Sequence, residues 1–130
     1  MKKTVLFAGF PEAELLSIYK VILPLGYRGL KVKPEDYSKP LGVLLSLDQE
    51  SSFQDAGNLF TDVRINRFLV MAGFESTDIN LLLAAFRKNH IASIPYKAIL
   101  TPTNRFWKLS DLYAEIQKEH ESMQQMNKKE

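Results

Sequence analysis

The sequence predicts an α/β fold in which two tandem β-α-β-α units share one small sheet. Three observations support this: the ending of "VLFAGF" at 5–10 recurs in "LVMAGF" at 69–74, an apolar helical stripe follows each copy, and a further strand and helix follow each stripe. Strands that are wholly apolar belong in a sheet covered on both faces. Strands that alternate with helices favour parallel pairing. We therefore expect a four-stranded, mainly parallel sheet of order 2-1-3-4 with helices on both faces, and a ferredoxin-like α+β fold as the alternative.

The first element of each unit is a short apolar strand that ends in a Gly-Phe turn. Gly9 and Gly73 occupy the same place in the two copies, 64 positions apart. Two equal halves related by a twofold axis along the strands would place the first and third strands side by side. Their Gly-Phe turns would then flank the switch point at which α/β sheets tend to hold ligands.

The second element of each unit is an amphipathic helix. Apolar residues recur with the spacing i, i+3, i+4, i+7 from Leu15 to Ile22, and again from Ile79 to Phe86. This spacing is typical of a helix with one buried face. At the start of the second of these helices, Asp78 complements the positive end of the helix dipole.

The last two elements of each unit are another strand and another helix, now related by 68 positions. "KVKP" at 31–34 matches "ILTP" at 99–102, and the leucines that follow match as well. The pseudo-repeats therefore span residues 4–47 and 67–123. We expect residues 48–66 to be a polar linker and residues 124–130 a flexible tail. The whole chain, 1–130, is expected to form a single domain.

The composition excludes several classes of function. The 17 basic and 15 acidic residues leave a net charge of +2, which is too small for a nucleic-acid-binding surface. The chain has no cysteine, so disulfides, thiolate zinc sites and iron–sulfur clusters are excluded. No segment approaches the ~20 apolar residues of a membrane span, and the apolar run near the N-terminus is too short for a signal peptide. We expect a cytoplasmic protein without nucleic-acid or membrane partners.

No pattern of catalytic residues is present. His90 and His120 do not stand in a metal-binding spacing, and no serine lies in a G-x-S-x-G turn. The two Gly-Phe turns lack the further glycines of a dinucleotide-binding loop and the Gly-Lys-Ser/Thr of a P-loop. We therefore expect no catalytic residue, no metal and no cofactor, and the sequence favours a protein that is not an enzyme.

The most distinctive stretch is "AILTPTNRFWKLSDL" at 98–112, between the fourth strand and the last helix. Thr101, Thr103 and Asn104 supply two hydroxyls and an amide near a strand end, where such groups bind a carboxylate, phosphate or sugar. Together with Gly9 and Gly73 they form the candidate ligand-binding site. The other interpretation, which the sequence favours, is that these residues only shape a turn and that the nearby tryptophan, Trp107, closes the end of the core.

The second half also has a set of features in a recognisable order. Gly73 and Phe74 end a strand, Ala98 precedes Thr-Pro-Thr-Asn at 101–104, and Trp107 precedes a helix that contains Leu112 and Glu119. In these features the chain resembles a family of small bacterial α/β domains of unknown function, with Thr-Pro-Thr-Asn…Trp as the most specific part. The resemblance implies a free-standing bacterial cytoplasmic protein and implies no chemistry.

Two hypotheses of function follow. The leading one is a non-catalytic binding or regulatory module that makes protein or small-molecule contacts. Its last helix has an apolar stripe that continues through His120, beyond what a small sheet covers, and we expect this helix to serve a homodimer or a protein partner. The alternative is a small-metabolite-binding domain or enzyme with a polar site at the C-terminal ends of the strands.

Overall fold

The computed structural model, which describes residues 2–47 and 64–128 and side chains as far as residue 122, contains a four-stranded sheet of order β2-β1-β3-β4. The strands are β1 (Thr4–Ala8), β2 (Arg28–Val32), β3 (Phe68–Ala72) and β4 (Tyr96–Ile99). Between and after them lie α1 (Glu12–Ile22), α2 (Leu41–Leu44), α3 (Ser76–Lys88) and α4 (Leu109–Lys128), with 3-10 turns η1 (Leu23–Leu25), η2 (Pro34–Asp36) and η4 (Asn104–Phe106). The predicted α/β fold and strand order are confirmed.

Two predicted segments lie partly outside the described residues. The linker 48–66 is described only from residue 64 onward. The tail 124–130 is described as far as Lys128, where α4 ends.

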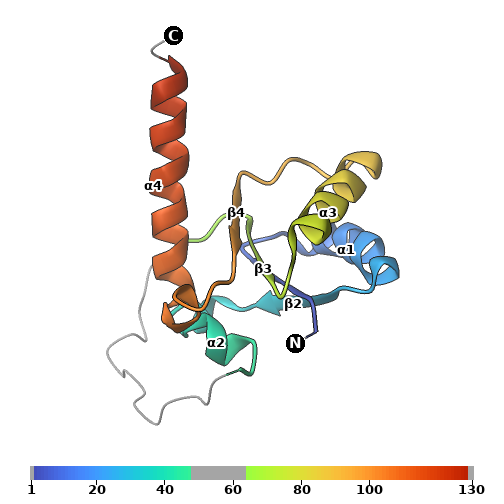
Figure 1. Cartoon of the computed structure of the whole chain (residues 1–130), viewed down its shortest axis with the longest axis horizontal. Coiled ribbons are helices and arrows are strands. Elements are labelled where there is room, and N and C mark those ends of the chain that lie inside the picture. The colour runs from blue at the N-terminus through green and yellow to red at the C-terminus, as the bar shows by residue number, and fades with distance from the viewer. Residues whose placement is uncertain (1, 48–63, 129–130) are drawn as a thin grey trace.

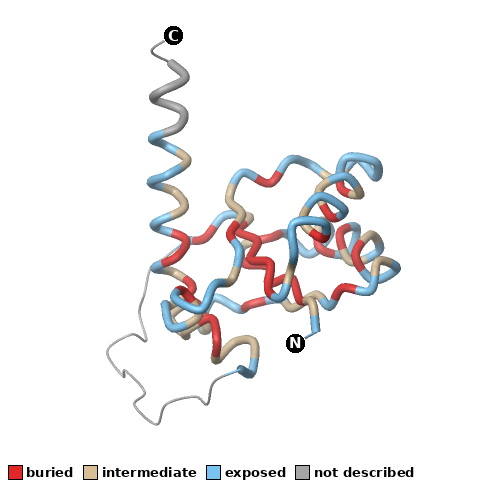
Figure 2. The backbone as a smooth tube through the Cα atoms, viewed as in Figure 1, coloured by how far each residue is buried: buried red, intermediate tan, exposed pale blue. Residues whose placement is uncertain are grey.

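Helices cover both faces of the sheet, as predicted. Helices α1 and α3 lie side by side on one face, and α2 and α4 lie on the other (Figure 1). Side chains along β1 alternate between the two layers: Phe7 packs in the core under α1 and α3, whereas Leu6 packs in the core under α2 and α4. The sheet is therefore buried on both sides (Figure 2), which explains why β1 and β3 are apolar throughout. The ferredoxin-like alternative, with helices on one face, is not observed.

The central strand pair, β1 with β3, is antiparallel, whereas β1–β2 and β3–β4 are parallel. The expected twofold axis along the strands, which would make this pair parallel, is therefore wrong. The register pairs Leu6 with Val70, and on either side of this pair Thr4 with Ala72 and Ala8 with Phe68. A twofold axis perpendicular to the sheet, at the Leu6–Val70 pair, therefore relates the pairs on its two sides. As a consequence, the C-terminal ends of β1 and β3 lie at opposite ends of the sheet.

Two ion pairs join the halves in the same reciprocal manner. Lys3 Nζ lies 2.9 Å from Asp78 Oδ2, and Arg67 Nε lies 2.7 Å from Glu14 Oε1. The two basic residues stand 64 positions apart, as do the two acidic residues. Each basic residue, just before a central strand, thus pairs with the acid in the first turn of the helix of the other half.

Asp78, which is buried, is the centre of the first of these contacts. Its carboxylate accepts hydrogen bonds from the Glu75 amide, from Lys3 and from the buried hydroxyl of Tyr27, at 3.0, 3.0 and 3.1 Å. Chiefly the Glu75 amide, and then Lys3, hold the pKa of Asp78 below its usual value, against the opposing effect of burial. Asp78 therefore does more than complement the helix dipole: it fastens the start of α3 to the first half.

The two left-handed glycines in the first half provide a matched pair of substitutions. Gly9 has φ 75° and Gly26 has φ 87°, but a Cβ on Gly9 would overlap the carbonyl of Ile65, whereas nothing lies near Gly26. Gly26→Ala should cost about 1–2 kcal/mol from backbone strain. Gly9→Ala should cost roughly 1–3 kcal/mol more because of the overlap. Urea denaturation measures both, and equal losses would contradict the close contact at Gly9.

Asp78 predicts a specific acid dependence of stability. Because its folded-state pKa is lowered, its contribution is fully present above the unfolded value of about 3.9 and is lost as the pH falls through the folded value. Asp78→Asn should reduce the free energy of unfolding at neutral pH and flatten its decline below about pH 4. Urea titrations from pH 2 to 7 test this, with Glu35→Gln on an exposed residue as the control that keeps the wild-type profile. Parallel declines in Asp78→Asn and wild type would refute the role of Asp78.

Candidate functional site

The structure does not gather the five predicted site residues in one place. Strands β3 and β4 are parallel, and the Leu100 amide donates to the Met71 carbonyl at 2.9 Å. Gly73 and the loop that begins at Thr101 therefore lie at the same end of the sheet. Gly9 follows β1, which runs in the opposite direction, so it lies at the other end.

The backbone of the chain itself occupies the space at Gly9. Gly9 and Gly73 both adopt positive φ, 75° and 76°, a conformation that glycine adopts without strain. At Gly9 the carbonyl of Ile65 stands where a side chain would begin, and the Arg67 amide donates to the Gly9 carbonyl at 3.1 Å. The space that the missing side chain of Gly9 leaves is thus filled by the backbone of residues 65–67.

The polar groups of Thr101 and Asn104 are used to close their own turn. The Thr101 amide donates to Asn104 Oδ1 at 2.8 Å, and the Asn104 amide donates to Thr101 Oγ1 at 3.0 Å. The Asn104 side chain also donates to the Ile99 carbonyl at 3.0 Å and is buried. Thr103 is exposed. Thr101 and Asn104 thus form a structural turn, which directs the chain into η4.

The expectation that Trp107 closes the core is wrong. The Trp107 residue is 39% exposed, and its neighbour Phe106 is 65% exposed. The core beneath α4 is filled instead by Leu109, Leu112 and Tyr113, which are buried. Neither Phe106 nor Trp107 belongs to that core, and the two residues form an exposed surface that we call the aromatic corner.

The first half of the chain holds the backbone of the aromatic corner in place. The Leu41 amide donates to the Trp107 carbonyl at 3.0 Å, and the Leu109 amide donates to the Lys39 carbonyl at 3.1 Å. These bonds flank an antiparallel bridge between Pro40 and Lys108. The aromatic corner therefore projects from a backbone that is bonded to the segment entering α2.

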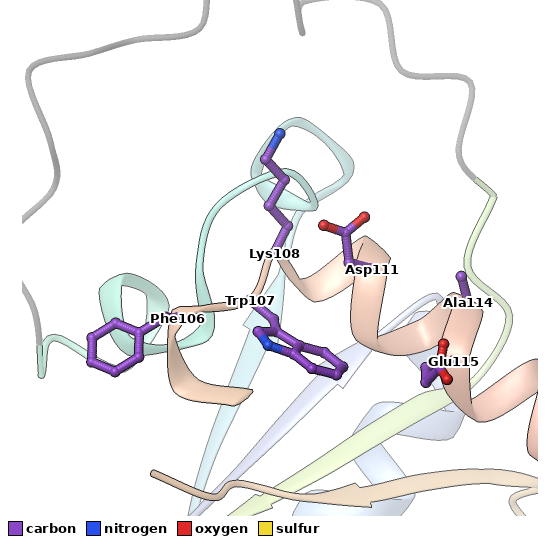
Figure 3. Close-up of a pocket in the computed structure, with 6 residues that line it drawn as sticks. All are labelled: Phe106, Trp107, Lys108, Asp111, Ala114 and Glu115. Carbon is purple, nitrogen blue, oxygen red and sulfur yellow. The ribbon is translucent and has the colours of Figure 1, made fainter. Parts of the chain in front are cut away.

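An open depression of about 530 Å³ lies beside the aromatic corner. Its lining residues come from η4 and the first turns of α4: Phe106, Trp107, Lys108, Asp111, Ala114 and Glu115 (Figure 3). Figure 3 shows the indole lying along the start of α4, with Glu115 further along the helix and the Asp111 carboxylate projecting from the first turn, away from the indole. The depression thus combines an aromatic face with two acidic groups. These groups suit binding, and they include no nucleophile next to a base.

The titratable side chains with shifted pKa values lie outside the depression. Burial raises the pKa of Tyr19, Tyr27 and Tyr37 and lowers that of Lys97, and none of these side chains lines the depression. The His120 ring contacts Tyr96 edge-on, with 5.3 Å between centroids. Over the described ranges, no three His, Cys, Asp or Glu side chains are placed to hold a metal ion. Within the same ranges, no helix has the length and hydropathy needed to cross a membrane.

Comparison with known proteins identifies a family domain in the second half of the chain. Residues 67–123 match the model of a domain of unknown function, DUF3783. The predicted relationship to a small family of unknown function is therefore confirmed. The match covers β3, α3, β4 and most of α4, and so includes the aromatic corner. No curated protein and no solved structure matches the chain significantly.

The turn that precedes the aromatic corner can be tested with two neighbouring substitutions. Asn104→Ala removes hydrogen bonds to Thr101 and Ile99 and should lower the free energy of unfolding by about 1–3 kcal/mol. Thr103→Ala, on an exposed residue, should change it by less than about 0.5 kcal/mol. Urea denaturation followed by fluorescence of the one tryptophan measures both. Similar stabilities of the two variants would show that the Asn104 bonds are unimportant.

Proposed function

We propose that this protein is a non-catalytic binding module that contacts a protein partner through the aromatic corner. The observation that supports this proposal is the exposure of Phe106 and of the only tryptophan, beside an open depression. Exposed apolar patches rimmed by polar groups mark interaction sites. Tryptophan is also among the residues that contribute most binding energy in protein interfaces.

The fixed backbone of the aromatic corner supports the proposal further. Trp107 is bonded on both sides, to Asn104 through its amide and to Leu41 through its carbonyl, at 2.9 and 3.0 Å. A surface held in its binding geometry before association loses less entropy when a partner arrives. By contrast, Thr101 and Asn104 already bond to each other and to the backbone, so no specific observation favours a small-metabolite or enzyme site at the strand ends.

We also propose that the two halves are copies of one β-α-β-α unit. Support comes from the reciprocal contacts, in which Leu6 pairs with Val70 across the sheet and Pro40 bridges to Lys108 between the loops. In this scheme the positions equivalent to Phe106 and Trp107 in the first half hold serine and lysine, at 38–39. The aromatic corner therefore belongs to the second unit alone, the unit that matches the family.

We also propose the cellular location of the protein and the class of organism it comes from. The absence of cysteine and the family resemblance support a bacterial cytoplasmic protein. Helix α4 extends well beyond the sheet (Figure 1), which supports its use by a second copy or another protein as an additional contact.

Site-specific photo-crosslinking in the cells that make the protein tests the proposed surface. A benzophenone amino acid at position 106 should capture a partner protein, because this side chain projects into the aromatic corner. The same group at Leu16, which is 63% exposed on α1, is the control and should capture nothing specific. Adding Trp107→Ala to the position-106 variant should abolish the crosslink.

Two results would contradict the proposal. One is equal crosslinking at positions 16 and 106, which would show that the aromatic corner is not a specific contact surface. The other is a metabolite that stabilises the protein by about 2.7 kcal/mol at a hundred times its dissociation constant and loses this effect in Thr103→Ala but not in Trp107→Ala. That pattern would support the polar site instead.

A further inference from the structure

We infer that the aromatic corner binds a basic segment of a partner protein, with one Arg or Lys side chain lying over Trp107. This inference rests on the proposed function and adds the chemistry of the partner. It follows from three features of the surface: an indole with no ring or cation contact among the described residues, carboxylates in the same depression, and the spacing of the carboxylates along α4.

The indole face suits a cation. The flat faces of aromatic rings attract ammonium and guanidinium groups, and tryptophan attracts them most strongly. Phe106 already has such a partner, because the Arg105 guanidinium carbon lies 5.2 Å from its ring centroid. Within the described part of the chain, Trp107 has no ring or cation contact, although it is partly exposed. A cation from another molecule can therefore occupy its face.

The carboxylates in the same depression complement a cation. Asp111 and Glu115 line the depression with Trp107 (Figure 3), and Glu119 follows one turn further along α4. All three are exposed, and among residues whose side chains are described none of them forms an ion pair. Lys108 also lines the depression, and in Figure 3 its side chain projects next to that of Asp111. The lining therefore carries two carboxylates and one ammonium group, in a chain whose net charge is +2.

The spacing of the three carboxylates indicates an extended partner. Residues four apart on a helix are separated by about 6 Å along its axis, and alternate residues of an extended chain are about 6.6 Å apart. A segment with a basic residue at every second position can therefore place one cation over Trp107 and others beside the acids. Like charges four apart on a helix repel each other and weaken the helix. A basic partner removes this repulsion, whereas nucleic acid, anionic lipid or an acidic peptide would be repelled.

A defined peptide tests the inference on the full chain. The probe is fluorescein-labelled Gly-Arg-Gly-Arg-Gly-Arg-Gly, followed by anisotropy and by the fluorescence of Trp107. The control peptide replaces arginine with citrulline, which keeps the shape and removes the charge. The inference predicts saturable binding of the arginine peptide, affinity lower by about tenfold or more for the citrulline peptide, and a change in tryptophan emission on binding.

Two pairs of variants separate a specific site from general charge attraction. Asp111→Asn with Glu115→Gln should weaken the arginine peptide by about tenfold and should leave α4 folded, because it removes exposed charges only. Glu12→Gln with Glu35→Gln changes the net charge equally on other exposed residues and should weaken it by less than about twofold. Trp107→Ala should weaken binding by about fivefold, whereas Leu16→Ala should leave it unchanged.

Each contrary result overturns the inference. Absence of arginine-peptide binding, equal binding of the citrulline peptide, or equal weakening by both double variants would do so. A dimer in size-exclusion chromatography that Trp107→Ala dissociates would also do so, since a second copy would then cover the aromatic corner. If crosslinking at position 106 still depends on Trp107 while the peptide does not bind, the inference fails and the proposed function stands. If crosslinking fails as well, both fail.

Discussion

The antiparallel pairing of β1 with β3 is the constraint on which the other contacts depend. Its antiparallel direction, with the register centred on Leu6 and Val70, places α1 and α3 together on one face and α2 with α4 on the other. The same arrangement brings each basic residue that precedes a central strand to the acid at the start of the other half's helix. It also places residues 39–41 against 107–109. The first half thereby supports the backbone from which the aromatic corner projects.

Sequence periodicity predicted the elements because they follow from burial. A wholly apolar strand needs two covering layers, and each helical stripe reports one buried face. The strand order was predicted from the equivalence of the two halves, and a twofold axis places β1 beside β3 whether it runs along the strands or perpendicular to the sheet. The direction of the central pair was not predictable in this way. Right-handed crossovers allow either direction: a parallel centre would put α1 and α3 on opposite faces, and an antiparallel centre puts them on the same face. One feature of the sequence does bear on this direction. Lys3 precedes Glu14 by the same number of positions as Arg67 precedes Asp78, and each basic residue pairs with the acid of the other half.

The candidate site was harder to predict, because residue type does not distinguish a turn from a binding site. Thr101 and Asn104 are suited to either role, and only their mutual hydrogen bonds show that they close a turn. Trp107 reads as a core residue by type, yet the space beneath α4 is filled by its neighbours. His90 shows the same limit: it adopts φ 60°, and Gly26, 64 positions earlier, adopts φ 87°, so residue type alone does not identify a left-handed backbone position.

The central claim is that the two halves form one cooperative unit joined by β1 and β3, with the aromatic corner fixed on that unit. Native-state hydrogen exchange measured residue by residue tests this most directly. The account predicts that the most protected amides of β1 and β2 and those of β3 and β4 exchange with the same free energy, equal to that of global unfolding. A clearly lower free energy for one half, with the other still protected, would contradict it.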